Sequence, residues 1–179
     1  MSELTVIVPC KNEEEAIPLF YKELITQTAF LEKRGTNLNL LFIDDGSTDR
    51  TVDVVRQLHQ TDHRVHMISF SRNFGKEAAM YAGLRAAANS DYAVIMDADL
   101  QDPPALLEEM FSYIDEGYDS VATRRVTRKG EPPIRSFFAR RFYRVMRKLS
   151  DTEIMDGARD YRLMTNQFIS AVFMSVYML

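Results

Sequence analysis

Short apolar runs alternate with longer amphipathic stretches over the first 123 residues of this chain. A short apolar run bounded by polar turns is typical of a buried strand, whereas a longer stretch with apolar positions three and four residues apart is typical of a helix. Strands that alternate with helices form βαβ units, in which the strands are parallel. The pattern therefore predicts an α/β fold with a mainly parallel sheet flanked by helices. We expect strands at 4–8, 39–43, 65–70, 91–96 and 119–123, and helices at 13–33, 49–61, 75–88 and 103–116.

A different pattern follows the Gly- and Pro-containing segment 129–133. From Ile134 to Leu149, apolar residues recur at intervals of three and four, and arginines occupy the remaining faces. This spacing predicts a basic amphipathic helix. Such a helix can lie on an anionic membrane surface, or it can pack on the core with its basic face in solvent, and the spacing leaves both open. The stretch 168–179 is largely apolar but too short to cross a membrane, and it predicts a core helix.

Charge is distributed unevenly along the chain. The 179 residues carry a net charge of −4, but residues 124–148 hold ten Lys and Arg against one acidic residue, a net of +9. The remainder holds the other 12 basic and 25 acidic residues, a net of −13. A basic segment on an acidic body indicates a local anionic partner, such as a phosphate, a membrane surface or a nucleic acid. The length suits one domain, and the single cysteine, Cys10, excludes an internal disulfide.

The most specific candidate chemistry follows the apolar run 92–96. Asp97 and Asp99 come directly after it, and residues two apart in an extended backbone point the same way. Two such carboxylates can hold a hard divalent cation, the cation can hold a diphosphate, and Gln101 adds a third oxygen donor. The next two residues, Asp102-Pro103, predict a helix start with Asp as the N-cap. An ordinary turn would explain that cap, but it would not explain two carboxylates that are costly at a strand end unless solvated or paired.

Polar clusters also follow other expected strands. Residues 8–13 come after the first strand, and residues 44–49 after the second. The carboxyl ends of parallel strands meet at one sheet edge, so these clusters and Asp97 are expected to share a crevice. There Asp44 can accept the N–H of a uracil-like base, although an Asp-Gly turn followed by a helix cap would explain the same residues. Gly75-Lys76 opens a helix whose N-terminus attracts anions.

These motifs, in this order, resemble the family 2 glycosyltransferases, which have a GT-A fold, a Rossmann-like α/β fold. The resemblance is to the polyprenyl-phosphate glycosyltransferase branch, which includes dolichol-phosphate mannose synthase and bacterial undecaprenyl-phosphate glucosyltransferases. The strings Ser71–Glu77 and Asp97–Pro104 are the most specific to this branch. The other matching stretches are Val6–Glu13, Asp44–Thr51, Phe142-Tyr143 and Asp160–Leu163.

The resemblance implies a donor side and an acceptor side of one site. On the acceptor side it implies that Asp160 is the catalytic carboxylate, accompanied by Arg162. Arginines of the basic segment, with Arg124, Arg128 and Arg135 as candidates, would pair with an acceptor phosphate. On the donor side, Mg²⁺ or Mn²⁺ would be held by Asp97, Asp99 and Gln101. All residues expected to bind the donor are Pro9, Asn12, Glu13, Asp44, Asp45, Lys76, Asp97, Ala98, Asp99 and Gln101.

The expected function is inverting transfer of a sugar from a nucleotide diphosphate sugar, with UDP-glucose favoured, to a polyprenyl phosphate at the cytoplasmic face of the cell membrane. The basic helix would then lie against the anionic membrane surface. No nucleic-acid partner is expected, and a homo-oligomer stays open. Residues 1–179 are expected to form a single catalytic domain, with a nucleotide-sugar-binding part at 1–123 and an acceptor- and membrane-facing part at 124–179, truncated before C-terminal membrane helices.

Two alternatives remain at this point. The same fold can transfer sugar to a glycan or another hydroxyl acceptor, in which case Asp160 would act as a general base. A phosphate acceptor is already anionic at neutral pH, so Asp160 would then orient the acceptor or an arginine. The second alternative is a non-catalytic domain that binds a nucleotide sugar or a nucleic acid.

Overall fold

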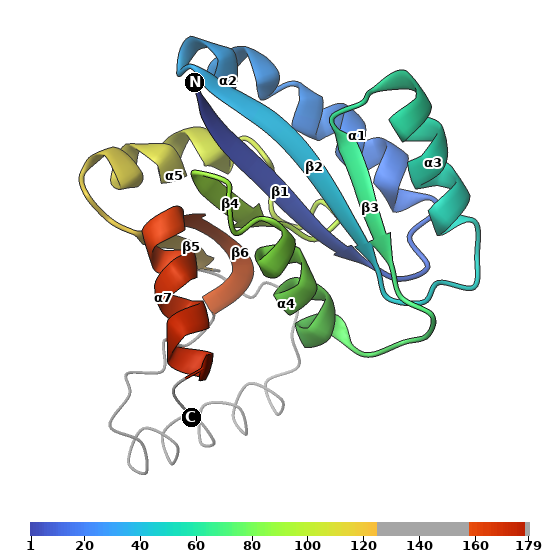
Figure 1. The fold of residues 1–179 in the computed structure, drawn as a ribbon. Helices are drawn as coiled ribbons and strands as arrows, with labels where there is room; N and C mark the ends of the chain where they lie inside the picture. Colours follow the sequence, from blue (N-terminus) through green and yellow to red (C-terminus); the bar gives the residue numbers. More distant parts are fainter. Residues whose placement is uncertain (125–157, 178–179) are drawn as a thin grey trace, which may run out of the picture. The chain divides into compact units, whose positions relative to one another are not determined.

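The computed structural model describes residues 1–124 and 158–177 (Figure 1). The described strands are β1 (Ser2–Cys10), β2 (Thr36–Asp44), β3 (Val65–Ser69), β4 (Tyr92–Ile95), β5 (Ser120–Arg124) and β6 (Ala158–Thr165). The described helices are α1 (Ala16–Ile25), α2 (Thr28–Lys33), α3 (Thr51–Thr61), α4 (Lys76–Ala86), α5 (Leu106–Asp115) and α7 (Asn166–Tyr177).

The described strands form one sheet in the order β3-β2-β1-β4-β6-β5. β1 pairs in parallel with β2 and with β4, β2 pairs in parallel with β3, and β4 pairs antiparallel to β6. The mainly parallel α/β sheet predicted from the alternating pattern is therefore confirmed. The chain divides into two compact units, residues 1–121 with 160–179, and residues 122–159. The packing and the candidate site discussed below belong to the first unit.

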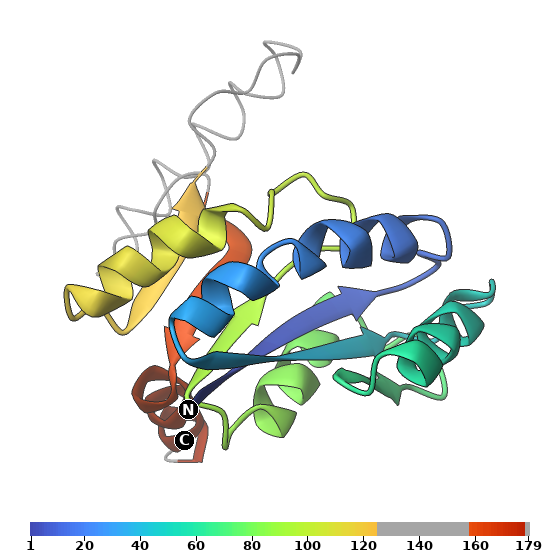
Figure 2. The same cartoon turned by 90° about the horizontal axis from the view of Figure 1, so that it is seen from above.

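Apolar side chains cover both faces of the sheet. Val6 and Val8 of β1 belong to a cluster with residues of α1, α2, α3 and α5, whereas Ile7 belongs to a second cluster with residues of α4 and α7. Figure 2 shows α1, α2 and α5 on one side of the sheet and α4 and α7 on the other. A strand buried on both faces needs apolar residues at every position, which explains why the sequence shows continuous runs instead of alternation.

The predicted helix over 13–33 is wrong in one respect, because the structure has two helices there. α1 ends at Ile25 and α2 begins at Thr28. The hydroxyl of Thr26 donates to the carbonyl oxygen of Glu23 at 2.6 Å. A threonine side chain that bonds to the backbone in this way competes with helix continuation. Both halves still bury apolar residues, so the periodicity itself does not reveal the break.

The predicted start of the fourth helix at Pro103, capped by Asp102, is also wrong. α5 begins at Leu106, with Ala105 at the N-cap position and no side-chain cap hydrogen bond. The residue before a proline is disfavoured in helical conformation, and Pro103 is followed by Pro104. The chain makes a turn there first, in which the N–H of Leu106 donates to the carbonyl oxygen of Pro103 at 3.1 Å.

The C-terminal part of the described chain contains a strand that the sequence patterns did not predict. β6 carries charged residues at Asp160 and Arg162 but buries Tyr161, Leu163 and Met164. The predicted core helix at the end of the chain is present as α7, which buries Ile169 in the second cluster. The predicted basic amphipathic helix at 134–149 lies outside the described residues.

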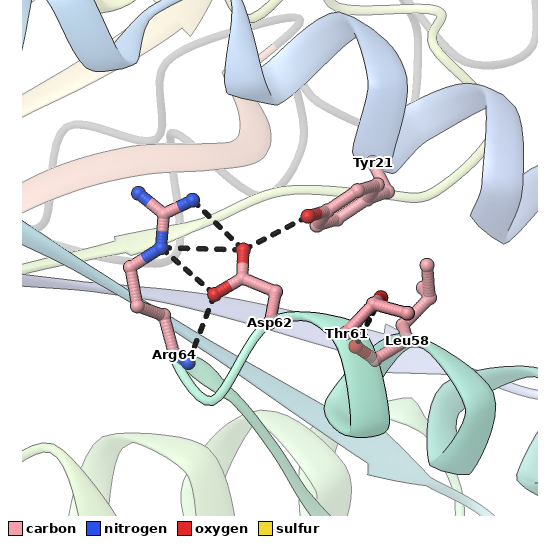
Figure 3. A network of polar contacts seen from close by, with 5 residues as sticks. All are labelled: Tyr21, Leu58, Thr61, Asp62 and Arg64. Atoms are coloured by element: carbon pink, nitrogen blue, oxygen red, sulfur yellow. Dashed lines mark hydrogen bonds and ion pairs between the residues drawn. The ribbon is translucent and has the colours of Figure 1, made fainter.

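A polar network fixes α1 to the turn between α3 and β3 (Figure 3). The hydroxyl of Tyr21 donates to Asp62 Oδ2 at 2.8 Å, and the guanidinium of Arg64 donates to both oxygens of the same carboxylate. These hydrogen bonds, those from Arg64 foremost, lower the pKa of Asp62 to about 2. The ionised carboxylate therefore holds two elements that come from different parts of the chain.

Candidate active site

A cavity of about 430 Å³ opens where β1, β2 and β4 end and α4 begins. The carboxyl ends of parallel strands form the ligand-binding edge of open α/β sheets. The polar clusters that follow these strands therefore share one crevice, as predicted. The lining residues are Pro9, Cys10, Lys11, Glu13, Asp45, Asn73, Gly75, Lys76, Ala79, Asp97, Ala98 and Asp99.

The structure brings together most, but not all, of the expected donor-side residues. Seven of them line the cavity, whereas Asn12, Asp44 and Gln101 do not. Lys11 and Asn73 line it without having been singled out from the sequence. Both lie inside the matching stretches 6–13 and 71–77, so their position within these motifs was the available signal. Arg124 ends β5, and Arg128 and Arg135 lie outside the described residues.

Asn12 joins the loop after β1 to the loop after β2. Its backbone has a φ of 57°, a left-handed conformation that asparagine tolerates better than most residues. The N–H of Asn12 donates to Ser47 Oγ at 2.9 Å, and Asn12 Oδ1 accepts the N–H of Thr48 at 2.8 Å. The structure therefore gives Asn12 a loop-bridging position, and its expected contact with a nucleotide stays a prediction.

Asp44 is 1% exposed at the end of β2. Its oxygens accept the N–H of Ser47 at 3.0 Å and the hydroxyl of Ser69, on the neighbouring strand β3, at 2.7 Å. The buried carboxylate thus supports the turn and the strand pair. Its expected role as an acceptor for a nucleotide base stays a prediction.

Asp45 holds the loop that leads into α4. Its carboxylate accepts the N–H of Phe74 at 2.6 Å and the N–H of Gly75 at 3.0 Å. The next residue, Gly46, has a φ of +69° and lies against the backbone of Arg72 and Asn73. A side chain at Gly46 would collide with that backbone. Together Asp45 and Gly46 set the position of the loop, and hence of the first residue of α4.

Lys76, the first residue of α4, connects the carboxylate of Asp97, just after β4, with that of Asp160 on β6. Its Nζ lies 2.7 Å from Asp97 Oδ1, 2.9 Å from Asp97 Oδ2 and 2.7 Å from Asp160 Oδ2. All three side chains are about half-exposed. The structure therefore places the expected metal ligand Asp97 and the expected catalytic residue Asp160 around one ammonium group.

Burial and nearby charges shift the pKa values of three groups at this edge of the sheet. Burial acts to lower the pKa of Lys76, but its hydrogen bonds with Asp160 and Asp97 outweigh burial and raise the pKa above its ordinary value. Burial, together with the nearby Asp99 and Asp97, raises the pKa of Glu13. Burial, with a smaller contribution from Asp44, raises the pKa of the Cys10 thiol to about 12. Cys10 is therefore an uncharged residue of the cavity wall, and the cavity lining holds four carboxylates against two ammonium groups, an excess that favours cations.

Four carboxylates line the cavity, and two of them, Asp97 and Asp99, are the expected ligands of a divalent cation. Asp97 and Asp99 both line it, and the N–H of Gln101 donates to Asp99 Oδ1 at 3.0 Å. Among the described residues, no group of three or more His, Cys, Asp or Glu side chains is arranged to hold a metal. Mg²⁺ in phosphate-transfer sites is typically bound by one or two carboxylates, with the substrate phosphates and water completing its shell. Asp97 and Asp99 fit that pattern.

Arg162 lies two residues after Asp160 on β6, and its Nη1 donates to Ser120 Oγ at 3.5 Å. It does not line the described cavity. Its expected contact with an acceptor stays a prediction. None of the described helices is long and apolar enough to span a membrane.

A family model described as glycosyl transferase family 2 matches residues 5–173 of the chain. A putative glycosyltransferase of Bacillus subtilis, CsbB, is 36% identical over 173 residues, which cover 94% of this chain and 50% of that protein. The prophage bactoprenol glucosyl transferase homolog of Escherichia coli is 35% identical over 170 residues, covering 95% of this chain and 54% of that protein. The bactoprenol glucosyl transferase of Shigella phage SfV matches to the same extent. The chain spans about half the length of these curated relatives.

Solved structures with the same architecture are more distant in sequence. A mannosyltransferase from Pyrobaculum calidifontis, in complex with GDP-Man and Mn²⁺, has a TM-score of 0.64 at 24% identity, covering 94% of this chain and 46% of that one. Glucosyl-3-phosphoglycerate synthase from Mycobacterium tuberculosis, in complex with Mn²⁺, UDP-glucose and phosphoglyceric acid, has a TM-score of 0.58 at 20% identity, covering 93% of this chain and 57% of that one. At these identities the likeness establishes the GT-A fold.

Proposed function

The chain belongs to glycosyl transferase family 2, and from this premise we propose that it transfers a sugar, with inversion, from a nucleotide diphosphate sugar to a polyprenyl phosphate. One observation carries the proposal: Asp97 and Asp99 line the cavity, and Lys76 joins Asp97 to Asp160. This arrangement supports one site in which the proposed donor-side and acceptor-side groups lie close together. Relatives named bactoprenol glucosyl transferases support the polyprenyl acceptor, and UDP-glucose is the proposed donor.

On the donor side, Asp97 and Asp99 would hold Mg²⁺ or Mn²⁺, with Gln101 as a further oxygen donor. When bound, the cation neutralises negative charge that grows on the departing diphosphate. Lys76 would place its ammonium group near the phosphates, at the N-terminus of α4, where backbone N–H groups also favour anions. Pro9 and Glu13 would form the side of the cavity that receives the nucleoside, with Asn12 and Asp44 fixing the loops behind it.

On the acceptor side, the difficulty is repulsion rather than weak nucleophilicity. A phosphate monoester has a second pKa near ~6, so its oxygen is already anionic at neutral pH. It must approach a cavity that contains Asp97, Asp99 and a diphosphate. Asp160 would therefore orient the acceptor or an arginine instead of removing a proton. Cationic partners for the acceptor phosphate would be Arg124, Arg128, Arg135 and Arg162.

The basic segment, residues 124–148, supports a location at the membrane surface. Residues 124–148, with their net charge of +9, would lie against an anionic membrane surface at the cytoplasmic face, where a polyprenyl phosphate is presented. Residues 1–123 would then supply the donor site, and residues 124–179 the acceptor-facing part of the same catalytic domain.

The direct test is transfer of labelled glucose to lipid. The protein is incubated with Mn²⁺, UDP-[¹⁴C]glucose and undecaprenyl phosphate in detergent micelles, and label is measured in the organic extract. We expect label in the lipid phase that depends on Mn²⁺ and on the lipid phosphate. Label in lipid only when GDP-[¹⁴C]mannose replaces UDP-[¹⁴C]glucose would refute UDP-glucose as the donor. Label that appears only on an added hydroxyl acceptor would refute the phosphate acceptor. Neither transfer nor metal-dependent donor hydrolysis would indicate a binding domain.

The Asp160→Asn variant then separates two roles of the carboxylate. If Asp160 orients charged groups, activity falls by about 10²-fold at every pH, because the reacting groups lose their alignment. If it is a general base, the variant instead loses the acidic limb of the wild-type pH profile. Asp53→Asn is the matched control, because among the described residues the Asp53 side chain makes only an exposed ion pair with Arg56 on α3, and it does not line the cavity.

A further inference from the structure

Lys76 occupies both oxygens of the carboxylate that a metal would need. Its Nζ lies 2.7 Å and 2.9 Å from the two oxygens of Asp97. A divalent cation bound to Asp97 would have to share these oxygens with an ammonium group or displace it. Two cations at one carboxylate repel each other, so the contact seen here and metal binding at Asp97 compete.

The pairing of β4 with β6 explains why the Lys76 ammonium group lies beside Asp97. β4 and β6 are antiparallel, with Ile95 opposite Arg162. Asp97 follows Ile95 by two residues and Asp160 precedes Arg162 by two, and both carboxylates contact the same ammonium group. Two carboxylates this close repel each other. Lys76 offsets this repulsion by contacting both of them, although they lie more than sixty residues apart in sequence.

We propose that Lys76 is an exchangeable cation that stands in for the metal at Asp97 until a metal–diphosphate arrives, and that it then transfers to a diphosphate oxygen while it stays bound to Asp160. This inference rests on the proposed function, because it assumes a metal-bound diphosphate at Asp97. The Lys76 side chain is 40% exposed, so it has room to change partners.

Two consequences follow for binding. A divalent cation alone must take Asp97 from Lys76 and gives the ammonium no new partner, so it binds weakly. A cation that arrives with a diphosphate supplies a phosphate oxygen to the displaced ammonium, so the two bind synergistically. Lys76 thus couples metal binding to donor binding while it stays bound to Asp160.

The test measures Mn²⁺ binding without turnover. Free Mn²⁺ is titrated by electron paramagnetic resonance against the protein alone and against the protein with saturating UDP or GDP. The Lys76→Met variant keeps the apolar stem but removes the ammonium group, and Lys76→Gln provides a second, polar replacement. We expect both variants to bind Mn²⁺ alone about three- to tenfold more tightly than the wild type. We also expect them to lose most of the gain in Mn²⁺ affinity that the nucleotide gives the wild type.

Two further variants separate direct contact from a general effect of charge. Lys11→Met removes one positive charge from the same cavity, and among the described residues Lys11 forms no ion pair. It should tighten Mn²⁺ binding less than Lys76→Met does. Combining Lys76→Met with Asp97→Asn should abolish the gain, since the freed carboxylate is then absent. Circular dichroism confirms that each variant is folded.

Each outcome of the Mn²⁺ titrations either supports or refutes the proposed exchange. Tighter binding of Mn²⁺ alone in the Lys76 variants, but not in Lys11→Met, supports it. The exchange is refuted if the wild type binds Mn²⁺ with a nucleotide but the Lys76 variants bind Mn²⁺ alone no more tightly than the wild type does. That result leaves the proposed function standing. Equal gains in the Lys76 and Lys11 variants also refute the exchange. No Mn²⁺ binding to any variant, with or without nucleotide, overturns both the metal site and the exchange.

Discussion

Replacing Gly46 with alanine should damage both stability and donor binding. The residue has a φ of +69°, and a Cβ built on it would lie 2.5 Å from the carbonyl carbon of Arg72 and 2.7 Å from the backbone nitrogen of Asn73. These neighbours are backbone atoms, so a rotamer change cannot relieve the contact. The loop 71–75 must move away, and Lys76 at its end must move with it.

The magnitude has two parts. A left-handed backbone costs a non-glycine residue ~1–2 kcal/mol, of which ~0.4–1 kcal/mol is returned because alanine restricts the unfolded chain. Forcing the loop aside adds a further ~1–3 kcal/mol, as overpacking of a well-packed contact does. We therefore expect Gly46→Ala to lower the free energy of unfolding by about 2–4 kcal/mol in urea denaturation.

Gly35→Ala is the matched control. Gly35 has nearly the same φ, +71°, but a Cβ there meets nothing within 4 Å. It should lose only about 0.5–1 kcal/mol, and titration calorimetry with UDP or GDP and Mn²⁺ should show wild-type affinity. Gly46→Ala should bind the nucleotide at least several-fold more weakly. Equal stability losses in the two variants, or full nucleotide affinity in Gly46→Ala, would refute the reasoning.

Three further predictions concern the framework. Asp62→Asn should cost about 1 kcal/mol at pH 7, since partial exposure of Arg64 screens the pair. Because the pKa of Asp62 is lowered from 3.8 to about 2, its contribution is complete above pH 4 and is lost as the pH falls toward 2. Urea denaturation of wild type and variant should converge over that interval. Gly83→Ala should destabilise by about 1–2 kcal/mol in the same assay, because its Cβ would lie 2.2 Å from Ile7 Cγ2, and this outweighs the better helix propensity of alanine. Tyr161→Phe should leave the thermal midpoint unchanged or raise it, because the buried hydroxyl has no hydrogen-bond partner among the described residues.

The local patterns were sufficient to predict most of the framework. Apolar runs located the central strands β1, β2 and β4 because a strand buried on both faces must be apolar at nearly every position. The edge strands β3 and β5 are only partly buried, and their shorter apolar runs between predicted helices were still enough to locate them. The predicted helix boundaries that proved wrong were overridden by local side-chain and backbone effects. The hydroxyl of Thr26 bonds to the backbone and splits the first predicted helix, and the paired prolines delay α5. β6 escaped prediction because its exposed charges interrupt the apolar pattern.

The candidate site divides in the same way. Motif spacing was enough to predict that Asp97 and Asp99 share a cavity with residues from the other strand exits. It was not enough to separate residues that line the cavity from those that hold the loops. Asp44 and Asp45 are adjacent in sequence and both buried, yet only Asp45 lines the cavity. That difference depends on which backbone N–H groups the folded loops bring to each carboxylate.

The sequence alone specifies most directly which residues are buried, because hydrophobic periodicity can be read within a few neighbouring residues. Which charges meet depends on the register between strands that are distant in sequence. Asp97, Asp160 and Lys76 come from three separate segments, and no local pattern relates them. The antiparallel pairing of β4 with β6 brings the two carboxylates together, and the start of α4 places an ammonium group between them. The sequence predicts a metal-binding pair, whereas the fold shows that a lysine already occupies one of its ligands.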